Sequence, residues 1–323
     1  MITKKKCGAD FVKVQQKPPS NLPVDGGVSG ARPRKYCSLD GDADRVVYYY
    51  LDNDNGFHLL DGDKISTLVA THLRELAEMA DLSDKIKLCI VQTAYANGSS
   101  TDYIQNKMRC NVSCVPTGVK YLHHEAQKAD IGVYFEANGH GTVLFSEKAE
   151  KLIDDAYVSL IESSNVNGQT RKNLLFNNKI LNALYNLKHL KDCINQTVGD
   201  ALSDFLLVEL ILATRNLSVA DWNSLYTDLP SRQLKVSIKD RTLVKTYDAE
   251  RRVSSPSELQ TAIDEAVKEL NVREARAFVR PSGTEDVVRV YAEADTQANA
   301  DGLAKKVCQL VYDLAGGVGV RPQ

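Results

Sequence analysis

The stretch from residue 86 to residue 145 alternates short apolar runs with helix-like segments, and this alternation constrains the fold more than any other feature of the sequence. The apolar runs lie at residues 88–91, 112–115 and 131–135. Runs that are apolar along their whole length are typical of strands in sheets covered on both faces. The sequence therefore predicts an α/β domain made of βαβ units around a parallel sheet.

This stretch lies within the second of three predicted domains, which cover residues 1–85, 86–214 and 215–323. Long helical patterns, with a polar break near residues 165–168, end the second domain. The third domain mixes short apolar runs with two helical patterns, the last one over residues 298–314. That mixture predicts a small α+β domain at the C-terminal end.

A helix is expected at the end of the first domain, with its N-terminal cap near Asp63. Side chains recur there at helical spacing and form one core-facing stripe. The stripe consists of Ile65, Leu68, Val69, His72, Leu73 and Leu76. On such a stripe, His72 is expected to pack in the core rather than to bind a ligand.

Composition and charge exclude several classes of function. The formal net charge of -2 lacks the basic surplus that nucleic-acid binding needs. The longest apolar stretch, residues 205–212, is too short to span a bilayer and contains Glu209. The lysine-rich start has no apolar segment behind it, so we expect no signal peptide there. We therefore expect a cytoplasmic protein whose partners are small molecules, not nucleic acid or membrane.

Three carboxylates, Asp40, Asp42 and Asp44, alternate along a short loop before the apolar run at residues 46–50. Ionised carboxylates this close repel each other unless a cation intervenes, and their oxygens are ligands suited to a hard divalent ion such as Mg²⁺. A calcium-binding EF-hand loop is excluded, because it would need Gly at Arg45 and Glu at Leu51. The loop therefore indicates half of a phosphoryl-transfer site.

Two other interpretations of this acidic loop stay open. In phosphatases with a nucleophilic Asp, two such residues end a buried strand, whereas here the clearest strand follows the loop. The loop could also be a solvated turn. The nearby residues 52–56 illustrate that case, since a hairpin between strands ending at Leu51 and beginning at Phe57 explains them fully.

A second polar loop, residues 136–141, follows the apolar run that ends at Phe135. Ligands of βαβ domains gather at the carboxyl ends of strands, and the side chains of Glu136 and Asn138 can hydrogen-bond hydroxyl groups. The alternative is a plain two-glycine hairpin. Lys120, near a helix start after another strand end, could meet an anion, although a solvated lysine is the commoner outcome.

A third loop follows the apolar run at residues 275–279 and has the sequence Arg280-Pro281-Ser282-Gly283-Thr284. It offers a guanidinium fork, two hydroxyls and backbone N–H groups at a glycine turn, and all of these suit a phosphate. Arg289 interrupts the next apolar run and is expected to need an anionic partner. Glu285 or Asp286 could provide that partner without any ligand.

Together, the acidic, polar and arginine loops resemble those of the α-D-phosphohexomutase superfamily in order and spacing. Longer segments at residues 7–12, 91–100 and 132–141 resemble its phosphoacetylglucosamine mutase family. The resemblance implies a fold of βαβ domains with mixed sheets plus a C-terminal α+β domain. It implies a phosphomutase, an isomerase that interconverts N-acetylglucosamine 6-phosphate and N-acetylglucosamine 1-phosphate in UDP-N-acetylglucosamine biosynthesis.

The resemblance also assigns roles to residues of this chain. Mg²⁺ would be held by Asp40, Asp42 and Asp44. Sugar hydroxyls would be bound by Glu136, Ala137 and Asn138. The non-reacting phosphate would be bound by Arg280, Pro281, Ser282, Gly283, Thr284 and Arg289.

One element of the family is missing from this sequence. Family members transfer phosphate through a phosphoserine in a Thr-Ala-Ser-His-Asn-Pro-like loop, and no such loop occurs in the 323 residues. We therefore expect a fragment without the catalytic serine domain, with no catalytic residue of its own and little activity alone. The alternative is a non-catalytic protein that binds sugar phosphates or another partner.

Overall fold

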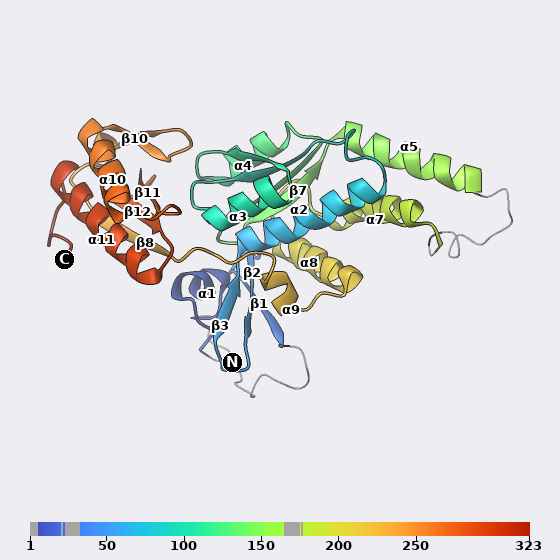
Figure 1. The fold of residues 1–323 in the computed structure, drawn as a ribbon, viewed down its shortest axis with the longest axis horizontal. Helices are drawn as coiled ribbons and strands as arrows, with labels where there is room; N and C mark the ends of the chain where they lie inside the picture. Colours follow the sequence, from blue (N-terminus) through green and yellow to red (C-terminus); the bar gives the residue numbers. More distant parts are fainter. Residues whose placement is uncertain (1–5, 21, 23–32, 165–174, 176) are drawn as a thin grey trace. The chain divides into compact units, whose positions relative to one another are not determined.

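The computed structural model describes residues 6–20, 22, 33–164, 175 and 177–323, and Figure 1 shows their secondary structure. Two compact units make up the chain. Unit 1 comprises residues 1–92, 102–113 and 119–226, and unit 2 comprises residues 93–101, 114–118 and 227–323. Two short segments of the predicted second domain thus belong to unit 2, and the predicted boundaries near residues 85 and 214 stay predictions.

The acidic loop lies in an antiparallel sheet of unit 1 with the order β1-β2-β3. Its strands are β1 (Lys35–Leu39), β2 (Val46–Leu51) and β3 (Phe57–Leu60), and helix α1 (Ala9–Gln15) contacts β1 and β2. The predicted hairpin between β2 and β3 is confirmed, with Tyr48 opposite Leu60. Strand β1 was not expected, so a strand precedes the acidic loop as well as following it. Only Ser38 of β1 is buried.

Helix α2 (Gly62–Met79) begins two residues earlier than expected, because Asp61 is its N-cap rather than Asp63. The Asp61 side chain accepts hydrogen bonds from the N–H groups of Asp63 and Lys64. All six residues of the predicted stripe are buried. Burial and the charge of Arg215 lower the pKa of His72 to about 4, so its neutral ring packs in the core as predicted.

The second sheet of unit 1 has the order β5-β4-β6-β7. Its strands are β4 (Leu88–Gln92), β5 (Asn111–Cys114), β6 (Ile131–Phe135) and β7 (Gly141–Phe145). Strands β4 and β6 pair in parallel, as predicted, whereas β7 pairs antiparallel with β6 and makes the sheet mixed. The connecting segments contain α3 (Gly98–Asp102), a π-helical turn at Tyr103–Lys107, and α4 (Val119–Ala126).

Long helices complete unit 1 (Figure 1). They are α5 (Glu147–Ser164), α7 (Lys179–Cys193) and α8 (Ala201–Arg215), followed by the short α9 (Val219–Asn223). Helices α7 and α8 both pack on α2, which explains why α2 is buried on most of its surface. The predicted break near residues 165–168 lies outside the described residues. None of the helices described here has the length and hydropathy needed to cross a membrane.

Unit 2 contains an antiparallel sheet with the order β11-β12-β8, covered on one face by two helices. Its elements are β8 (Ser231–Ser237), α10 (Ser257–Leu270), β11 (Arg276–Pro281), β12 (Val287–Glu293) and α11 (Gln297–Leu314). A 3₁₀ turn (Arg241–Leu243) and a small hairpin of β9 (Lys245–Tyr247) and β10 (Arg252–Ser255) were not expected. The predicted C-terminal α+β organisation is confirmed.

The face of this sheet opposite the helices carries three cross-strand pairs of β11 and β12. Arg276 lies opposite Glu293, Phe278 opposite Tyr291, and Arg280 opposite Arg289. Residues 93–101 pack here: Tyr95 contacts the rings of Phe278 and Tyr291, and Arg276 donates hydrogen bonds to the carbonyls of Ala94 and Ala96. The loop after β4 is therefore part of the core of unit 2.

One buried acid in unit 1 has no compensating partner. Asp204, in the first turn of α8, is 0% exposed. Neither of its carboxylate oxygens has a hydrogen-bond partner in the described part of the chain. Burial, with a smaller effect of the charge of Asp200, raises its pKa well above the usual value for Asp. The folded protein therefore keeps this proton at pH values where the unfolded chain releases it.

We predict that Asp204→Asn removes a pH dependence from the stability of unit 1. As the pH rises from about 4 to the raised pKa, the unfolded chain binds fewer protons than the folded one, so wild-type stability falls by up to about 1.4 kcal/mol per pH unit. Urea unfolding at pH 5 and pH 7, followed by fluorescence of the buried Trp222, measures this change.

The exposed Asp155 on α5 offers a matched control. Asp155→Asn should keep the wild-type difference between the two pH values, whereas Asp204→Asn should reduce it. An unchanged difference in Asp204→Asn would mean that Asp204 ionises normally in the folded protein.

Candidate functional site

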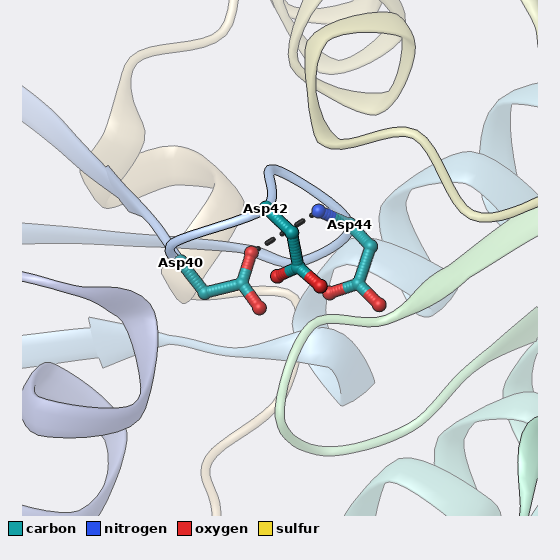
Figure 2. A group of neighbouring side chains, drawn as sticks. All are labelled: Asp40, Asp42 and Asp44. Carbon is teal, nitrogen blue, oxygen red and sulfur yellow. Dashed lines mark hydrogen bonds between the residues drawn. The ribbon is translucent and has the colours of Figure 1, made fainter.

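The acidic loop connects β1 to β2 and brings its three carboxylates together, as Figure 2 shows. Oxygens of Asp40, Asp42 and Asp44 all lie within 4.8 Å of one another. The loop is closed by Asp40, whose Oδ1 accepts the backbone N–H groups of Asp44 at 3.1 Å and Arg45 at 3.2 Å. Local hydrogen bonds thus hold together groups that repel each other.

The donor set of this loop fits a hard divalent cation. Asp44 Oδ1 is buried and accepts no hydrogen bond from any described residue. The guanidinium of Arg45 lies beside it, with Nε 3.4 Å from Asp44 Oδ1 and 3.5 Å from Asp40 Oδ2. The same guanidinium also pairs with Asp10. One arginine cannot neutralise three neighbouring carboxylates, and all three offer the oxygen ligands that Mg²⁺ prefers.

The polar loop at residues 136–141 lies directly beside the acidic loop in unit 1. His140 Nδ1 lies 3.0 Å from Asp44 Oδ2, and the N–H of Val46 donates to the carbonyl of Gly139 at 3.1 Å. Gly139 has φ +91°, and a Cβ there would lie 2.0 Å from the Val46 carbonyl oxygen. Only glycine allows this close approach, so the sequence of one loop fixes the position of the other.

Within this polar loop, the side chains of Glu136 and Asn138 lie together. Asn138 Nδ2 is 3.4 Å from Glu136 Oε2, and Asn138 Oδ1 accepts the N–H of His140 at 3.0 Å. Glu136, Ala137 and Asn138 are all partly exposed. The hairpin alternative is confirmed, because the loop connects the antiparallel strands β6 and β7. The loop is thus both a tight turn and a surface with hydrogen-bonding groups for hydroxyls.

The arginine loop lies in unit 2, between β11 and β12. Ser282 organises it: its N–H donates to the carbonyl of Val287 at 2.9 Å, and its buried Oγ accepts the N–H groups of Thr284 and Glu285, both at 3.4 Å. Gly283 and Thr284 are exposed at the tip, and Pro281 ends β11. The tip therefore presents a hydroxyl and backbone groups to solvent.

Next to this loop, the register of the sheet places three cations in a row. Arg289 on β12 lies opposite Arg280 on β11 and opposite Lys235 on β8. Like charges directly opposite each other destabilise a sheet. Arg280 Nε donates to Glu250 Oε1 at 2.9 Å, whereas no described carboxylate forms an ion pair with Arg289. The alternative that Glu285 or Asp286 pairs with Arg289 is therefore not observed among the described residues, and the Arg289 side chain is exposed rather than buried in the sheet.

Several residues of these loops were not foreseen. Arg45 and His140 both contact Asp44 of the acidic loop. Lys235 lies opposite Arg289, and Glu250 accepts a hydrogen bond from Arg280. Arg45 and His140 stand inside the motifs and could have been noticed there, whereas Lys235 and Glu250 give no local signal. Lys120 is exposed and lies over the ring of Tyr121, as expected for a solvated lysine.

Two family models match the chain. They are "phosphoacetylglucosamine mutase AMG1, domain III" over residues 61–217 and "phosphoglucomutase/phosphomannomutase, C-terminal domain" over residues 235–310. The phosphoacetylglucosamine mutases of Mus musculus and Saccharomyces cerevisiae are 50% and 48% identical to it over 317 and 306 residues. These matches cover 98% and 94% of this chain but 54% and 51% of the relatives, so the chain spans about half of their length.

Solved structures show the same fold. Aspergillus fumigatus N-acetylphosphoglucosamine mutase, in complex with GlcNAc-6P and magnesium, matches with a TM-score of 0.82 and 46% identity over 96% of this chain and 53% of that one. A product complex of an N-acetylglucosamine-phosphate mutase of the α-D-phosphohexomutase superfamily matches with a TM-score of 0.83 and 47% identity, over 95% of this chain and 53% of that one. The predicted fold class is confirmed.

We predict that Asp40→Asn, Asp42→Asn and Asp44→Asn each weaken binding of a divalent cation to the chain by at least about tenfold, because each removes one anionic ligand. Titration with Mn²⁺, followed by electron paramagnetic resonance, measures the affinity. Asp54→Asn, in the exposed turn between β2 and β3, should bind as the wild type does. Equal binding by all four variants would identify the acidic loop as an ordinary turn.

Proposed function

Because the chain belongs to the phosphoacetylglucosamine mutase family of the α-D-phosphohexomutase superfamily, we propose that it carries the metal-, sugar- and phosphate-binding loops of a phosphomutase. The proposed reaction interconverts N-acetylglucosamine 6-phosphate and N-acetylglucosamine 1-phosphate. The observation that carries the proposal is the row of Arg280, Arg289 and Lys235, in which Arg289 has no ion-pair partner among the described residues.

The acidic loop is proposed to hold Mg²⁺ through Asp40, Asp42 and Asp44. A Mg²⁺ ion there would supply positive charge that stabilises a phosphoryl group during its transfer. The protein contributes the placement of the ligands: Asp40 closes the loop, Arg45 offsets part of its negative charge, and His140 contacts Asp44 from the polar loop.

The polar loop is proposed to bind hydroxyl groups of the sugar. The Glu136 carboxylate accepts hydrogen bonds from hydroxyls, and the Asn138 amide both donates and accepts them. Their contact with each other keeps the two side chains together, and the backbone of Ala137 lies between them in the turn. Fixed donors and acceptors of this kind orient a sugar without reacting with it.

The arginine loop is proposed to bind whichever phosphate of the substrate is not reacting. In the proposed reaction, a phosphoserine gives its phosphoryl group to a sugar hydroxyl, and the bisphosphate then returns its other phosphoryl group to the serine. The loop must therefore accept a phosphate from either end of the sugar. A guanidinium fork beside the exposed turn at Gly283 suits that task, because it recognises the phosphate group alone.

The UDP-N-acetylglucosamine pathway and a cytoplasmic location stay predictions from the sequence. They rest on the resemblance and on the composition, and they add nothing to the chemistry proposed for the loops.

We predict that Arg289→Ala and Arg280→Ala each weaken binding of N-acetylglucosamine 6-phosphate by about 10- to 100-fold, since each removes a charge-assisted hydrogen bond to phosphate. Glu136→Ala should weaken binding of this compound but leave binding of inorganic phosphate unchanged. Isothermal titration calorimetry measures both ligands. Arg273→Ala, an exposed arginine of the same unit, is the control and should bind as the wild type does.

We further predict that the 323-residue chain binds N-acetylglucosamine 6-phosphate without converting it, because the sequence contains no phosphoserine loop of the family type. Incubation with Mg²⁺ and glucose 1,6-bisphosphate, followed by ³¹P magnetic resonance, would detect the 1-phosphate product. Turnover by the chain alone would contradict this prediction. Absence of any binding would exclude both the mutase role and the alternative of a non-catalytic sugar-phosphate binder.

A further inference from the structure

Glu250 makes two contacts that the proposed function does not use. It lies between β9 and β10, and its side chain is only 18% exposed. Its Oε1 accepts the Nε–H of Arg280 at 2.9 Å, and its Oε2 accepts the backbone N–H of Thr117 at 2.9 Å. One carboxylate therefore connects an arginine of the phosphate loop with the loop that follows β5. All three residues belong to unit 2.

The backbone that carries Glu250 is strained. Asp248, Ala249 and Glu250 have φ values of +52°, +54° and +66°, three consecutive residues other than glycine in the left-handed region. The turn is held by Arg251, which donates to the carbonyl of Asp248 through Nε and to its carboxylate through Nη2. Strained residues persist only where their surroundings over-determine them, and they cluster at ligand clamps.

Through Glu250, this turn contacts Arg280, which is one of the three neighbouring cations together with Arg289 and Lys235. The cross-strand pairs on the open face of the sheet differ in charge: Arg276 meets Glu293, whereas Arg280 meets Arg289. Although burial lowers it, the contact with Glu250 leaves the pKa of Arg280 above its ordinary value. Glu250 thus offsets the repulsion that the register imposes on Arg280, and it does so from outside the sheet.

Contact through Nε also determines how the guanidinium is oriented. A guanidinium has five N–H donors in a rigid fork, so a partner at Nε fixes the plane of the fork and the direction of the two Nη groups. The charges of Arg280, Arg289 and Lys235 exceed that of Glu250 by two. That surplus matches the charge of a phosphate monoester dianion.

The second contact of Glu250 involves a loop with features of its own. The hydroxyl of Thr117 is buried and has no hydrogen-bond partner within the described ranges, and Gly118 has φ +132°. Because Glu250 holds the backbone N–H of Thr117, the position of this loop is linked to that of Arg280.

We propose that Glu250 is a positioning residue for phosphate binding, which orients the Arg280 fork and ties it to the Thr117 loop. The proposal rests on the proposed phosphate-binding function of the arginine loop. The proposal also gives the strained turn at residues 248–250 a role. The turn holds the Glu250 carboxylate next to Arg280, whose cross-strand neighbour in the sheet is another arginine, Arg289.

A double-mutant cycle on the whole chain tests the proposal, with inorganic phosphate as the probe and calorimetry as the readout. Glu250→Gln keeps the shape of the side chain, but its single amide oxygen cannot accept from both Arg280 and the Thr117 N–H. This variant should weaken phosphate binding about tenfold. In an Arg280→Lys background, which lacks the Nε contact, the same substitution should have less than about a threefold effect. In an Arg289→Lys background the tenfold effect should persist.

Glu265→Gln is the matched control. Glu265 is an exposed carboxylate on α10, outside the turn at residues 248–250, so the same substitution there should leave phosphate affinity at the wild-type value. If Glu250→Gln lowers the urea midpoint, Glu250→Asp serves as a second variant. It keeps the charge but withdraws the oxygens by one methylene, and it should also weaken binding.

The outcomes separate this proposal from the function on which it rests. No phosphate binding by the wild type would overturn the proposed function and, with it, the role of Glu250. Wild-type affinity in both Glu250 variants would overturn the positioning role alone. An equal loss from Glu250→Gln in the Arg280→Lys and Arg289→Lys backgrounds would also overturn it, because Glu250 would then not act through Arg280.

Discussion

Repulsion between like charges is the constraint on which the functional loops of this chain depend. In unit 1, hydrogen bonds from the Asp44 and Arg45 backbone hold Asp40 beside the other carboxylates of the acidic loop. In unit 2, strand register places Arg289 between two other cations. Both arrangements lower the stability of the fold, and a bound ion of opposite sign would offset that cost. Local conflicts of this kind are expected at functional sites, where stability is exchanged for binding.

Much of the fold could be predicted because its signals are local. The β2–β3 hairpin follows from a turn of Asp, Asn and Gly between apolar runs, and the buried stripe of α2 follows from helical spacing. Strand β1 was missed because only Ser38 of its residues is buried, which leaves no alternation in the sequence. The cap of α2 was misplaced by two residues because Asp61 and Asp63 are equally good candidates by residue type.

For the candidate site, the sequence indicates which residues cluster but not which clusters meet. Three carboxylates in five residues, and an arginine before Ser-Gly-Thr, stand out in the chain itself. The contact of His140 with Asp44 depends on how β7 follows β6, and the contact of Glu250 with Arg280 joins residues 30 positions apart. Arg289 shows the same limit: neighbouring acids suggest an ion pair that the register of the sheet does not make.

The segments that make up unit 2 have a consequence for its modularity. Residues 93–101 and 114–118 leave the chain of unit 1 and contribute to unit 2, where Ala94 and Ala96 accept hydrogen bonds from Arg276. A C-terminal piece that begins at residue 227 would lack both of these carbonyl acceptors and would expose the faces of Phe278 and Tyr291 that Tyr95 covers. Unit 2 is therefore a poor candidate for excision or for exchange between proteins by a single crossover, even though it has its own hydrophobic core.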